Sequence, residues 1–537
     1  MRQCQLLRLL RLLRRRVASV YKGDSRAWIY CERYSTVNNT NTNKVQRKQK
    51  MKKVSIYTLL VTVTLFIGIT VGIWQIKPPK ADLNCPAYQQ MMYNIGRFAA
   101  VPHPAGSKEI EIVRTAILEE IENMGLTPIV QDFEFNFGSI IENHVLMYGY
   151  SCYYEWWEDR DEEYFKSMRR ILGSGMPEVF DTVYDFFEFL YGIEITEESR
   201  TATQNILIEI KSSYTERGIM FVAHYDSGWD TPGAADAMVG VCAILETMRR
   251  FADYDGELKN SLYFLLTDAE ELGLVGAHAF VEDNPEFADK IDMVVNLEAR
   301  GNRGGLILFE TSPQAYHIMR TIVDSGVRPI GFSFAAKIYK LLGNATDFCV
   351  FLNEGYRGIN FAVAEGAEHY HQMTDTVGNL CPDSAWQYLQ TIFALADYTS
   401  VNSLESLRNT STEAVYFPFL PGNLVLMTIM FSQILCTLAV AAALIWVVFL
   451  IRKRQLKTVP SVLTGVFILL SAASAIILPA AGYLFYLPLL AYTITRFIKL
   501  FLRNQHAVYV TICSVSGVVV LLLWVPVIYM GIVAFVV

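Results

Sequence analysis

The chain has 537 residues and a formal net charge of −7, and this negative charge argues against nucleic acid as a partner. Hydrophobic residues make up 52% of the chain, which is high for a soluble protein, and they concentrate in a few long runs that indicate membrane segments. The nine cysteines have no regular spacing and predict no disulfide framework.

Residues 1–53 form a basic and polar region that we expect to be largely disordered, although MRQCQLLRLLRLLRRR at its start has the pattern of an Arg-rich targeting or membrane-surface helix. Met51 precedes two lysines and a long apolar run, the form of a membrane-protein start. This favours Met51 as the true start and residues 1–50 as an untranslated extension. Residues 54–76 are long and apolar enough to span a bilayer, and without a following A-x-A signal they predict an anchor.

Between residues 80 and 410, short apolar runs alternate with helical stretches. The runs suit interior strands covered on both faces and lie at 205–210, 218–223, 261–267, 292–297, 305–310 and 359–363. Helical periodicity occurs at 109–124, 238–251, 272–281, 314–325 and 385–401. This order predicts an α/β fold, with a mostly parallel central sheet flanked by helices.

One segment interrupts this pattern. Residues 155–200 are rich in aromatic and acidic side chains, and we expect a helical insertion packed beside the cleft. Such an insertion would be either a lid that shapes the substrate pocket or a solvated decoration without a role.

The C-terminal region, residues 421–537, is expected to contain about four more transmembrane helices, with Pro479 and Gly482 marking a tight hairpin between the middle two. The apolar runs contain almost no charge, whereas ion and proton pathways usually need some. An anchoring or assembly role is therefore favoured over a transporter.

Basic clusters at 47–53, 452–457 and 496–503 would all fall on one side of a membrane that the chain crosses five times. The positive-inside rule assigns that side to the cytoplasm. The 80–410 domain would then lie on the opposite face, at the cell membrane of a bacterium or in an endomembrane (endoplasmic reticulum or vacuole) of a eukaryote.

Polar residues follow the ends of several predicted strands. Because the carboxyl ends of parallel strands meet at one edge of a sheet, we expect these side chains to lie close together. They are His224, Asp226, Asp236, Glu270, Glu271, Glu298, His369, His371 and Asp375. Each has an ordinary explanation alone, such as a loop residue or a charge at a helix N-terminus, but so many at one edge indicate a shared site.

These residue types suit a pair of zinc ions. Two zinc ions held by nitrogen and oxygen ligands need a histidine each, terminal carboxylates and a bridging carboxylate. A further carboxylate must accept a proton from the attacking water, and one of the adjacent Glu270 and Glu271 can serve as base while the other is a ligand. In His224-x-Asp226 the carboxylate can orient the imidazole.

The motifs HYDS, PGAADAMVG, TDAEELGLVGAHAF, NLEARG and YHQMTDT occur in the order and spacing of the di-zinc aminopeptidases, and the chain resembles metallopeptidase family 28 over about residues 85–400. The Glu in NLEA and the trailing apolar spans are similar to the membrane-bound branch, which includes the endoplasmic-reticulum metallopeptidase and the vacuolar membrane protease. The resemblance implies a zinc peptidase with two zinc ions per chain, a peptide substrate and a lipid bilayer as its surroundings.

The resemblance also implies a ligand set. Asp236 would bridge both zinc ions, His224 and Glu298 would complete one site, and Glu271 and His371 would complete the other.

The remaining roles follow in the same way. Glu270 would be the general base and later the acid, and Asp226 would orient its neighbouring histidine. Tyr370 and Arg300 are candidates for contact with the oxyanion or a substrate carboxylate, and Asp347 is a candidate beside the pocket.

The chain departs from the family pattern at two positions, because Ala235 stands where a second Asp is common and Ala237 where a polar residue is usual. Neither change removes a ligand, so the resemblance implies an active enzyme. His369 competes with His371 as the last ligand, and the H-x-x-x-D-T spacing favours His371.

Three functions remain open at this stage. The first is an aminopeptidase acting on the non-cytoplasmic face. The second is a glutaminyl-cyclase-like acyl transferase, which shares the fold and ligands but uses one zinc ion. The third is a catalytically inactive receptor or scaffold on the same fold.

Overall fold

The computed structural model describes residues 62–136, 200–341, 345–420, 423–453, 458–502 and 506–536, together with Leu59. The chain divides into two compact units, Met1–Thr62 and Val63–Val537, and every element named below belongs to the second. The basic N-terminal region and the insertion predicted at 155–200 lie outside the described residues.

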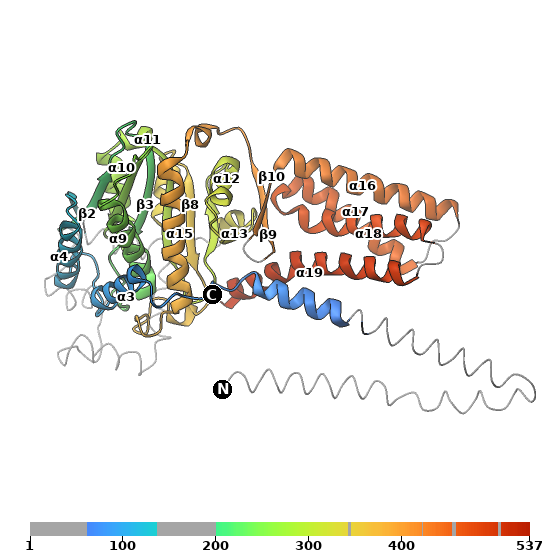
Figure 1. Ribbon diagram of the computed structural model, residues 1–537, viewed down its shortest axis with the longest axis horizontal. Coiled ribbons are helices and arrows are strands. Elements are labelled where there is room, and N and C mark those ends of the chain that lie inside the picture. Colours follow the sequence, from blue (N-terminus) through green and yellow to red (C-terminus); the bar gives the residue numbers. More distant parts are fainter. Residues whose placement is uncertain are drawn as a thin grey trace, which may run out of the picture. The chain divides into compact units, whose positions relative to one another are not determined.

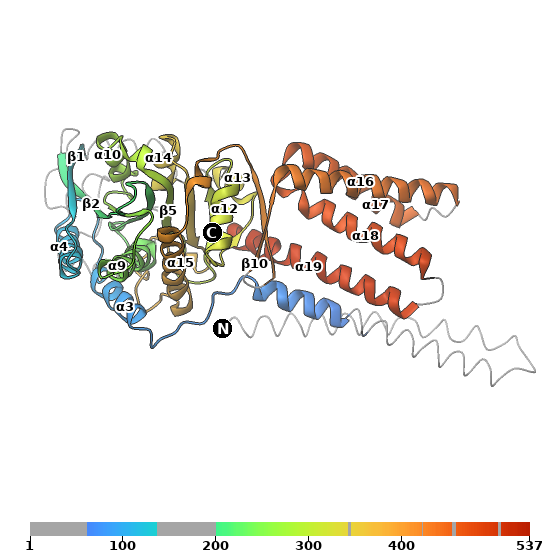
Figure 2. The same ribbon diagram turned by 45° about the horizontal axis from the view of Figure 1, so that its top comes forward.

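Within the described residues, eight strands form one mixed sheet in the order β1-β2-β4-β3-β5-β8-β6-β7 (Figures 1 and 2). They are β1 Ile129–Asn136, β2 Arg200–Ile210, β3 Gly218–His224, β4 Ser261–Thr267, β5 Ile291–Ala299, β6 Ile307–Thr311, β7 Ile330–Gly331 and β8 Gly358–Val363. The central strands β4, β3, β5 and β8 run parallel. Strand β2 is antiparallel to both of its neighbours, whereas β6 is antiparallel to β8 and parallel to β7. All six predicted runs are strands of this sheet, and the α/β architecture is confirmed; β1 and β7 were not predicted.

Helices cover both faces of the sheet, which is why the four central strands are buried along their whole length. One face carries α3 Pro86–Phe98, α4 Lys108–Asn123, α9 Val239–Ala252, α12 Tyr316–Asp324 and α15 Pro382–Val401. The other carries α10 Val275–Asp283, α11 Phe287–Lys290 and α14 Asp347–Asn353.

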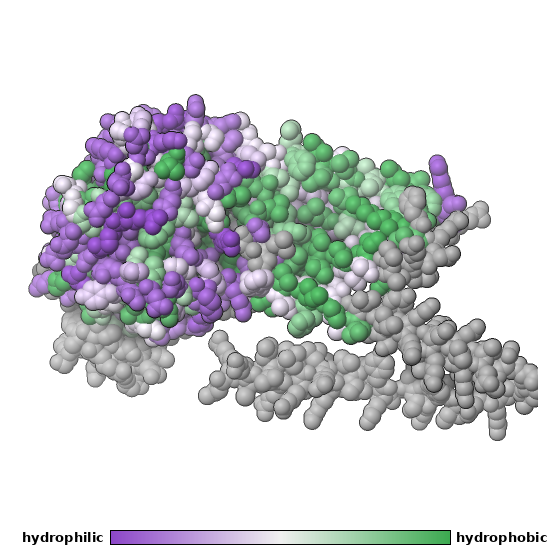
Figure 3. Space-filling model, in the orientation of Figure 1, coloured by the Kyte–Doolittle hydropathy of each residue, from purple (hydrophilic) through white to green (hydrophobic). Residues whose placement is uncertain are grey.

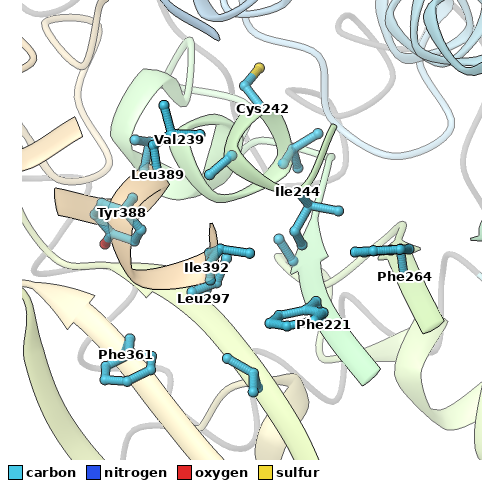
Figure 4. Close-up of a cluster of buried hydrophobic side chains, with 14 of the residues drawn as sticks. Phe221, Val239, Cys242, Ile244, Phe264, Leu297, Phe361, Tyr388, Leu389 and Ile392 are labelled. Carbon is cyan, nitrogen blue, oxygen red and sulfur yellow. The ribbon is translucent and has the colours of Figure 1, made fainter. Parts of the chain in front are cut away.

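The alternation of side chains along a strand divides the core into two clusters. On β3, Phe221 enters the cluster under α9 and α15, while the next residue, Val222, enters the cluster under α10 and α14. Figure 4 shows the first cluster, in which Phe221, Phe264 and Leu297 of the sheet lie near side chains of α9 and α15. This packing holds the strand ends in place and therefore fixes the residues that follow them.

Local signals set the start of α4. The Ser107 hydroxyl accepts a hydrogen bond from the Ile110 N–H at 3.1 Å, and Glu109 and Glu111 lie in the first turn, where negative charge is favoured. The residues that face the core are Ile110, Val113, Ala116, Ile117 and Ile121, as helical spacing requires.

The C-terminal part begins with an antiparallel hairpin and continues as helices. Its elements are β9 Ala414–Leu420, β10 Asn423–Thr428, α16 Ile429–Arg452, α17 Thr458–Ile477, α18 Tyr483–Phe501 and α19 His506–Val536. Within this region of expected transmembrane helices, the first helix begins only at Ile429, where the Thr428 hydroxyl accepts a hydrogen bond from the Phe431 N–H. A short turn, Pro479–Ala481, joins α17 to α18 at the predicted hairpin.

Two helices of the described residues, Ile429–Arg452 and Tyr509–Gly531, are long and apolar enough to cross a membrane. Thr62–Trp74 and Thr464–Ser474 are apolar but shorter. Figure 3 shows an extensive hydrophobic surface on this part of the molecule, and side chains such as Leu438, Ile445 and Leu469 are exposed there. The number of spans and their orientation remain predictions.

The helices pack against one edge of the sheet. A single buried cluster joins Ile307 and Ile330 of the sheet edge to Phe417 of β9 and Tyr483 of α18. The rings of Phe417 and Tyr483 stack with centroids 4.2 Å apart, and the Ser333 hydroxyl donates to the Ala480 carbonyl at 2.7 Å. The sheet and the C-terminal helices therefore share a core.

Candidate metal centre

The predicted ligands converge at the carboxyl edge of the parallel strands. His224 is the last residue of β3, Glu298 lies near the end of β5, and Glu270 and Glu271 follow β4. Asp236 lies in the turn Ala234–Met238 that leads into α9. His371 lies in the loop between β8 and α15, which contains the short 3-10 turn Ala367–His369.

One group forms around His224. Its Nε2 lies 3.5 Å from Asp236 Oδ1 and 3.5 Å from Glu298 Oε2, and all three residues are buried. A second group forms around His371, whose Nε2 lies 3.1 Å from Glu271 Oε2 and 3.5 Å from Asp236 Oδ2. Asp236 thus presents one oxygen to each group, which is the arrangement a bridging ligand needs.

A third combination, His224 with Glu270 and Glu271, also brings candidate ligand atoms within 4.8 Å of one another. His369 belongs to none of these groups in the described part of the chain, and its Nδ1 lies 2.8 Å from the Thr374 hydroxyl. Of the two competing histidines, the structure brings His371 to the site.

Asp226 holds two parts of the site together. Its Oδ1 and Oδ2 accept hydrogen bonds from the Glu270 and Glu271 N–H groups at 3.1 and 3.2 Å. The Nδ1 of His224 faces the Asp226 backbone carbonyl at 3.0 Å and its carboxylate at 3.4 Å, which leaves Nε2 directed at the ligand group. Asp226 therefore contacts the imidazole on the side away from the ligand group and also fixes the Glu270-Glu271 turn.

Asp375 performs the same task for Asp236, and no role was predicted for it from the sequence. Its carboxylate accepts hydrogen bonds from the Ala235 N–H at 3.0 Å and the Asp236 N–H at 3.2 Å. The Ala234 N–H also donates to its backbone carbonyl at 3.2 Å. The only signal in the sequence was its position four residues after His371.

Glu298 is held from two sides. The Asn296 side chain donates to Glu298 Oε1 at 3.0 Å and to Asn360 Oδ1 at 3.1 Å. The Tyr388 hydroxyl of α15 donates to the Glu298 backbone carbonyl. These contacts orient Glu298, and they come both from its near neighbour Asn296 and from Tyr388, 90 residues away in the sequence.

The electrostatics of the site reflect an excess of buried negative charge. Burial opposes the charge on both imidazoles, but the neighbouring carboxylates raise the pKa of His224 and of His371 well above the usual value. Burial raises the pKa of Glu270 well above its usual range and also raises that of Glu298. Burial works against ionisation of Asp236 too, yet hydrogen bonds from the two imidazoles lower its pKa to about 2.

The donor set fits divalent metal ions. Four carboxylates face two imidazoles here, so a cation would balance charges that the protein leaves uncompensated. Within the described part of the chain, Glu271 Oε1 is buried without a hydrogen-bond partner, as expected of an atom reserved for a metal. Nitrogen and oxygen donors in these numbers suit zinc.

The three candidate substrate-contacting residues lie around this centre. The Tyr370 ring stacks on the His371 imidazole with centroids 3.8 Å apart, and the Arg300 guanidinium lies 4.9 Å from the centre of the Tyr370 ring. Asp347 is the first residue of α14, and its Oδ2 accepts a hydrogen bond from the Thr267 hydroxyl at 2.5 Å.

Residues 205–396 match the profile of Peptidase family M28. This segment is a peptidase family M28 domain. Among curated proteins, the chain is 31% identical over 219 residues to a vacuolar membrane protease of Lachancea thermotolerans, which covers 40% of the chain and 22% of that relative. It is 29% identical over 241 residues to a putative endoplasmic reticulum metallopeptidase 1 of Schizosaccharomyces pombe, covering 44% and 29% of the two chains.

The rat endoplasmic reticulum metallopeptidase 1 is 26% identical over 204 residues, covering 37% of the chain and 23% of the relative. The matched M28 domain therefore spans about a quarter of the length of these relatives. These names agree with the membrane-bound branch that the motifs resemble.

Two solved structures are also similar to the chain. An aminopeptidase from Aneurinibacillus sp. strain AM-1 has a TM-score of 0.40 and 13% identity, covering 59% of this chain and 95% of that one. The glutaminyl cyclase of Fimbriiglobus ruber has a TM-score of 0.40 and 11% identity, covering 60% and 99%.

Proposed function

We propose that the chain is a membrane-anchored, zinc-dependent aminopeptidase that removes N-terminal residues from peptides. The placement of Asp236 carries this proposal, because its two oxygens face His224 and His371 separately, each at 3.5 Å. A carboxylate shared in this way suits two metal ions rather than one. The M28 domain supports peptidase chemistry.

The ligands divide into two sets. His224 and Glu298 would hold one zinc ion, His371 and Glu271 the other, and Asp236 both. When bound, the two ions supply Lewis acidity for the scissile carbonyl and for the attacking water.

Glu270 is the general base of the proposed reaction. Its backbone is held by Asp226, and its carboxylate lies beside both ligand sets without belonging to either in the assignment above. It accepts a proton from the attacking water and then gives it to the leaving amine. Burial raises its pKa, which suits a group that must both take and release a proton near neutral pH.

Tyr370 and Arg300 border the second ligand set, and both can donate hydrogen bonds. We propose that the Tyr370 hydroxyl stabilises the oxyanion that forms on the scissile carbonyl and that Arg300 holds the ring in place. Asp347 lies deeper, next to Thr267, and we assign it to the wall of the substrate site.

We further propose that the M28 domain lies on the non-cytoplasmic face of an endomembrane. The basic clusters beside the apolar runs support this orientation, and the relatives named above are proteins of the vacuole and the endoplasmic reticulum. Protease protection of sealed vesicles tests it, because the domain should be cleaved only after the membrane is opened.

The full chain in detergent tests the activity. Bound zinc is quantified, and amino-acyl fluorogenic substrates and a peptide with N-terminal glutamine are assayed with and without a chelator. About two zinc ions per chain and chelator-sensitive release of the N-terminal residue would support the proposal.

Two other outcomes would replace it. One zinc ion with cyclisation of the glutamine peptide would indicate an acyl transferase. A folded chain with neither metal nor turnover would indicate a scaffold that retains the ligand set.

A further inference from the structure

The two proposed zinc sites are built on supports of different rigidity. The first site takes His224 and Glu298 from buried strands at the centre of the sheet. The second takes His371 from the loop between β8 and α15, where His371 itself has a positive φ of 50°. A non-glycine residue keeps such a conformation only when its surroundings hold it there.

On one side, this loop is held by the segment that follows β5. The Arg303 N–H donates to the Glu365 carbonyl at 3.0 Å, and the two residues form an isolated antiparallel bridge. The Arg303 guanidinium also donates to Glu368 at 2.7 Å, a contact that is half-exposed. These contacts fix the start of the loop, six residues before His371.

On the other side, the loop is held by the last helix of the chain. The Tyr529 hydroxyl of α19 lies close to the Glu365 side chain. Ala364, the neighbour of Glu365, packs in the same hydrophobic cluster as Tyr529 and Met530. The start of the His371 loop is thus held by its backbone bridge to Arg303 and packs against α19 on the other side.

We propose that Tyr529 is a positioning residue for the second zinc site, acting through Glu365 on the loop that carries His371 and Tyr370. The inference rests on the proposed function, since it assumes that this site holds zinc. It follows that the second site is complete only when α19 is in place, whereas the first, built on β3 and β5, does not depend on that helix.

The test compares two conservative changes on α19 in the full chain in detergent. Tyr529→Phe removes the hydroxyl that lies close to Glu365. Tyr509→Phe is the matched control, because it removes a hydroxyl from the same helix whose described partner is the Arg496 guanidinium at 3.4 Å. Zinc affinity is measured by competition with a chelator, and kcat and KM are measured separately.

We expect Tyr529→Phe to weaken the second zinc by about 10-fold while the first is retained, a size typical of residues that orient a ligand. We expect kcat to fall while KM stays within about twofold, since the loss affects the reacting groups rather than general substrate binding. Tyr509→Phe should match the wild type in both measurements.

Changes at Glu365 show whether its contact with Tyr529 is responsible. Glu365→Gln keeps an acceptor for the Tyr529 hydroxyl and should retain the second zinc, whereas Glu365→Ala should lose it. The double variant Tyr529→Phe with Glu365→Ala should bind the second zinc as tightly as Glu365→Ala alone, because both changes break the same contact. If Tyr529→Phe does not fold, the Glu365 pair still decides the question.

Wild-type affinity for both zinc ions in Tyr529→Phe and Glu365→Ala would overturn the inference, as would equal loss of both ions. A wild-type chain that binds no zinc would refute the metal centre itself and the inference with it. If the wild type binds two zinc ions and Tyr529→Phe binds them equally well, only the role of α19 is refuted.

Discussion

At the scale of single residues, the site depends on carboxylates that bind backbone rather than metal. Asp226 accepts from the two N–H groups of the Glu270-Glu271 turn, and Asp375 accepts from those of Ala235 and Asp236. Each carboxylate fixes the position of one acidic segment through charge-assisted hydrogen bonds. Glu270, the proposed general base, and Asp236, the proposed bridging ligand, are therefore oriented by side chains that come from other loops.

The role of Glu270 is tested by Glu270→Gln. The amide keeps the size of the side chain but cannot accept the proton, so we expect zinc content to be retained and kcat to fall by about 10² to 10⁴-fold. Glu282→Gln on the exposed face of α10 is the control and should leave kcat unchanged. Full activity of Glu270→Gln would show that another group is the base.

Glu246 on α9 predicts a pH dependence of stability away from the metal centre. Burial raises its pKa to about 7, although Arg249 opposes the shift. Between about pH 4.5 and 7, the folded chain keeps a proton on Glu246 that the unfolded chain has already released. The free energy of unfolding should therefore fall as the pH rises through this range. The free energy of unfolding should fall by roughly 2 kcal/mol over this range. A pKa shift is worth about 1.4 kcal/mol per unit, and partial screening by solvent reduces the total.

Thermal unfolding at pH 5 and pH 8 checks this. Glu246→Gln should show a smaller drop in midpoint between the two values than the wild type, and Glu122→Gln on the exposed face of α4 should behave as the wild type. An unchanged pH dependence in Glu246→Gln would mean that the carboxyl ionises normally.

At the scale of elements, close contact between the first apolar helix and α19 depends on two glycines. A Cβ at Gly68 would lie 2.5 Å from Leu521 Cδ1, and a Cβ at Gly72 would lie 2.7 Å from Val525 Cβ. Glycines four residues apart let two helices approach closely, as in membrane helix pairs. The helix at 62–74 and α19 run side by side in Figures 1 and 2.

We therefore expect Gly68→Leu and Gly72→Leu to destabilise the chain by about 1–3 kcal/mol each, because overpacking forces the two helices apart. Gly531→Leu is the control, since a Cβ at Gly531 meets nothing within 4 Å. The unfolding midpoint in detergent is the measurement. Equal midpoints for Gly72→Leu and Gly531→Leu would contradict the packing.

At the scale of the whole unit, the core of the M28 domain continues past the limit of 410 that the sequence indicates. Val415, Tyr416 and Phe417 of β9 are 0%, 2% and 3% exposed, and Tyr416 belongs to the main core of the sheet. The two neighbours of Tyr416 join the cluster shared with α18. The hairpin β9–β10 thus belongs to the domain and to the helices at once.

Two shortened chains test this boundary. A chain of residues 80–410 should be less stable and less soluble than one of residues 80–428, because it loses large buried side chains worth about 1.5–3 kcal/mol each. The soluble yield and unfolding midpoint of each are compared with those of the full chain. If residues 80–410 are as stable as residues 80–428, β9 is not part of the core.

The sequence by itself determined the strands, the order of the helices and the residues brought to one edge. Each apolar run is continuous in the sequence, and His224, Glu270, Glu271 and Glu298 lie at or close after a strand end, so parallel strands must bring them together. Asp236 and His371 could be assigned only by resemblance, since their positions depend on a turn and a long loop.

Tertiary structure alone decided the contacts between distant parts of the chain. Asp375 bonds the Ala235 N–H across 140 residues, and Tyr529 reaches Glu365 from the last helix. The edge strands β1 and β7 were missed because edges lack the continuous apolar pattern of buried strands. The hairpin β9–β10 was missed because its apolar residues run directly into the expected membrane segment. Local patterns carry information about local burial, whereas hydrogen bonds across the fold exist only once the core has placed both partners.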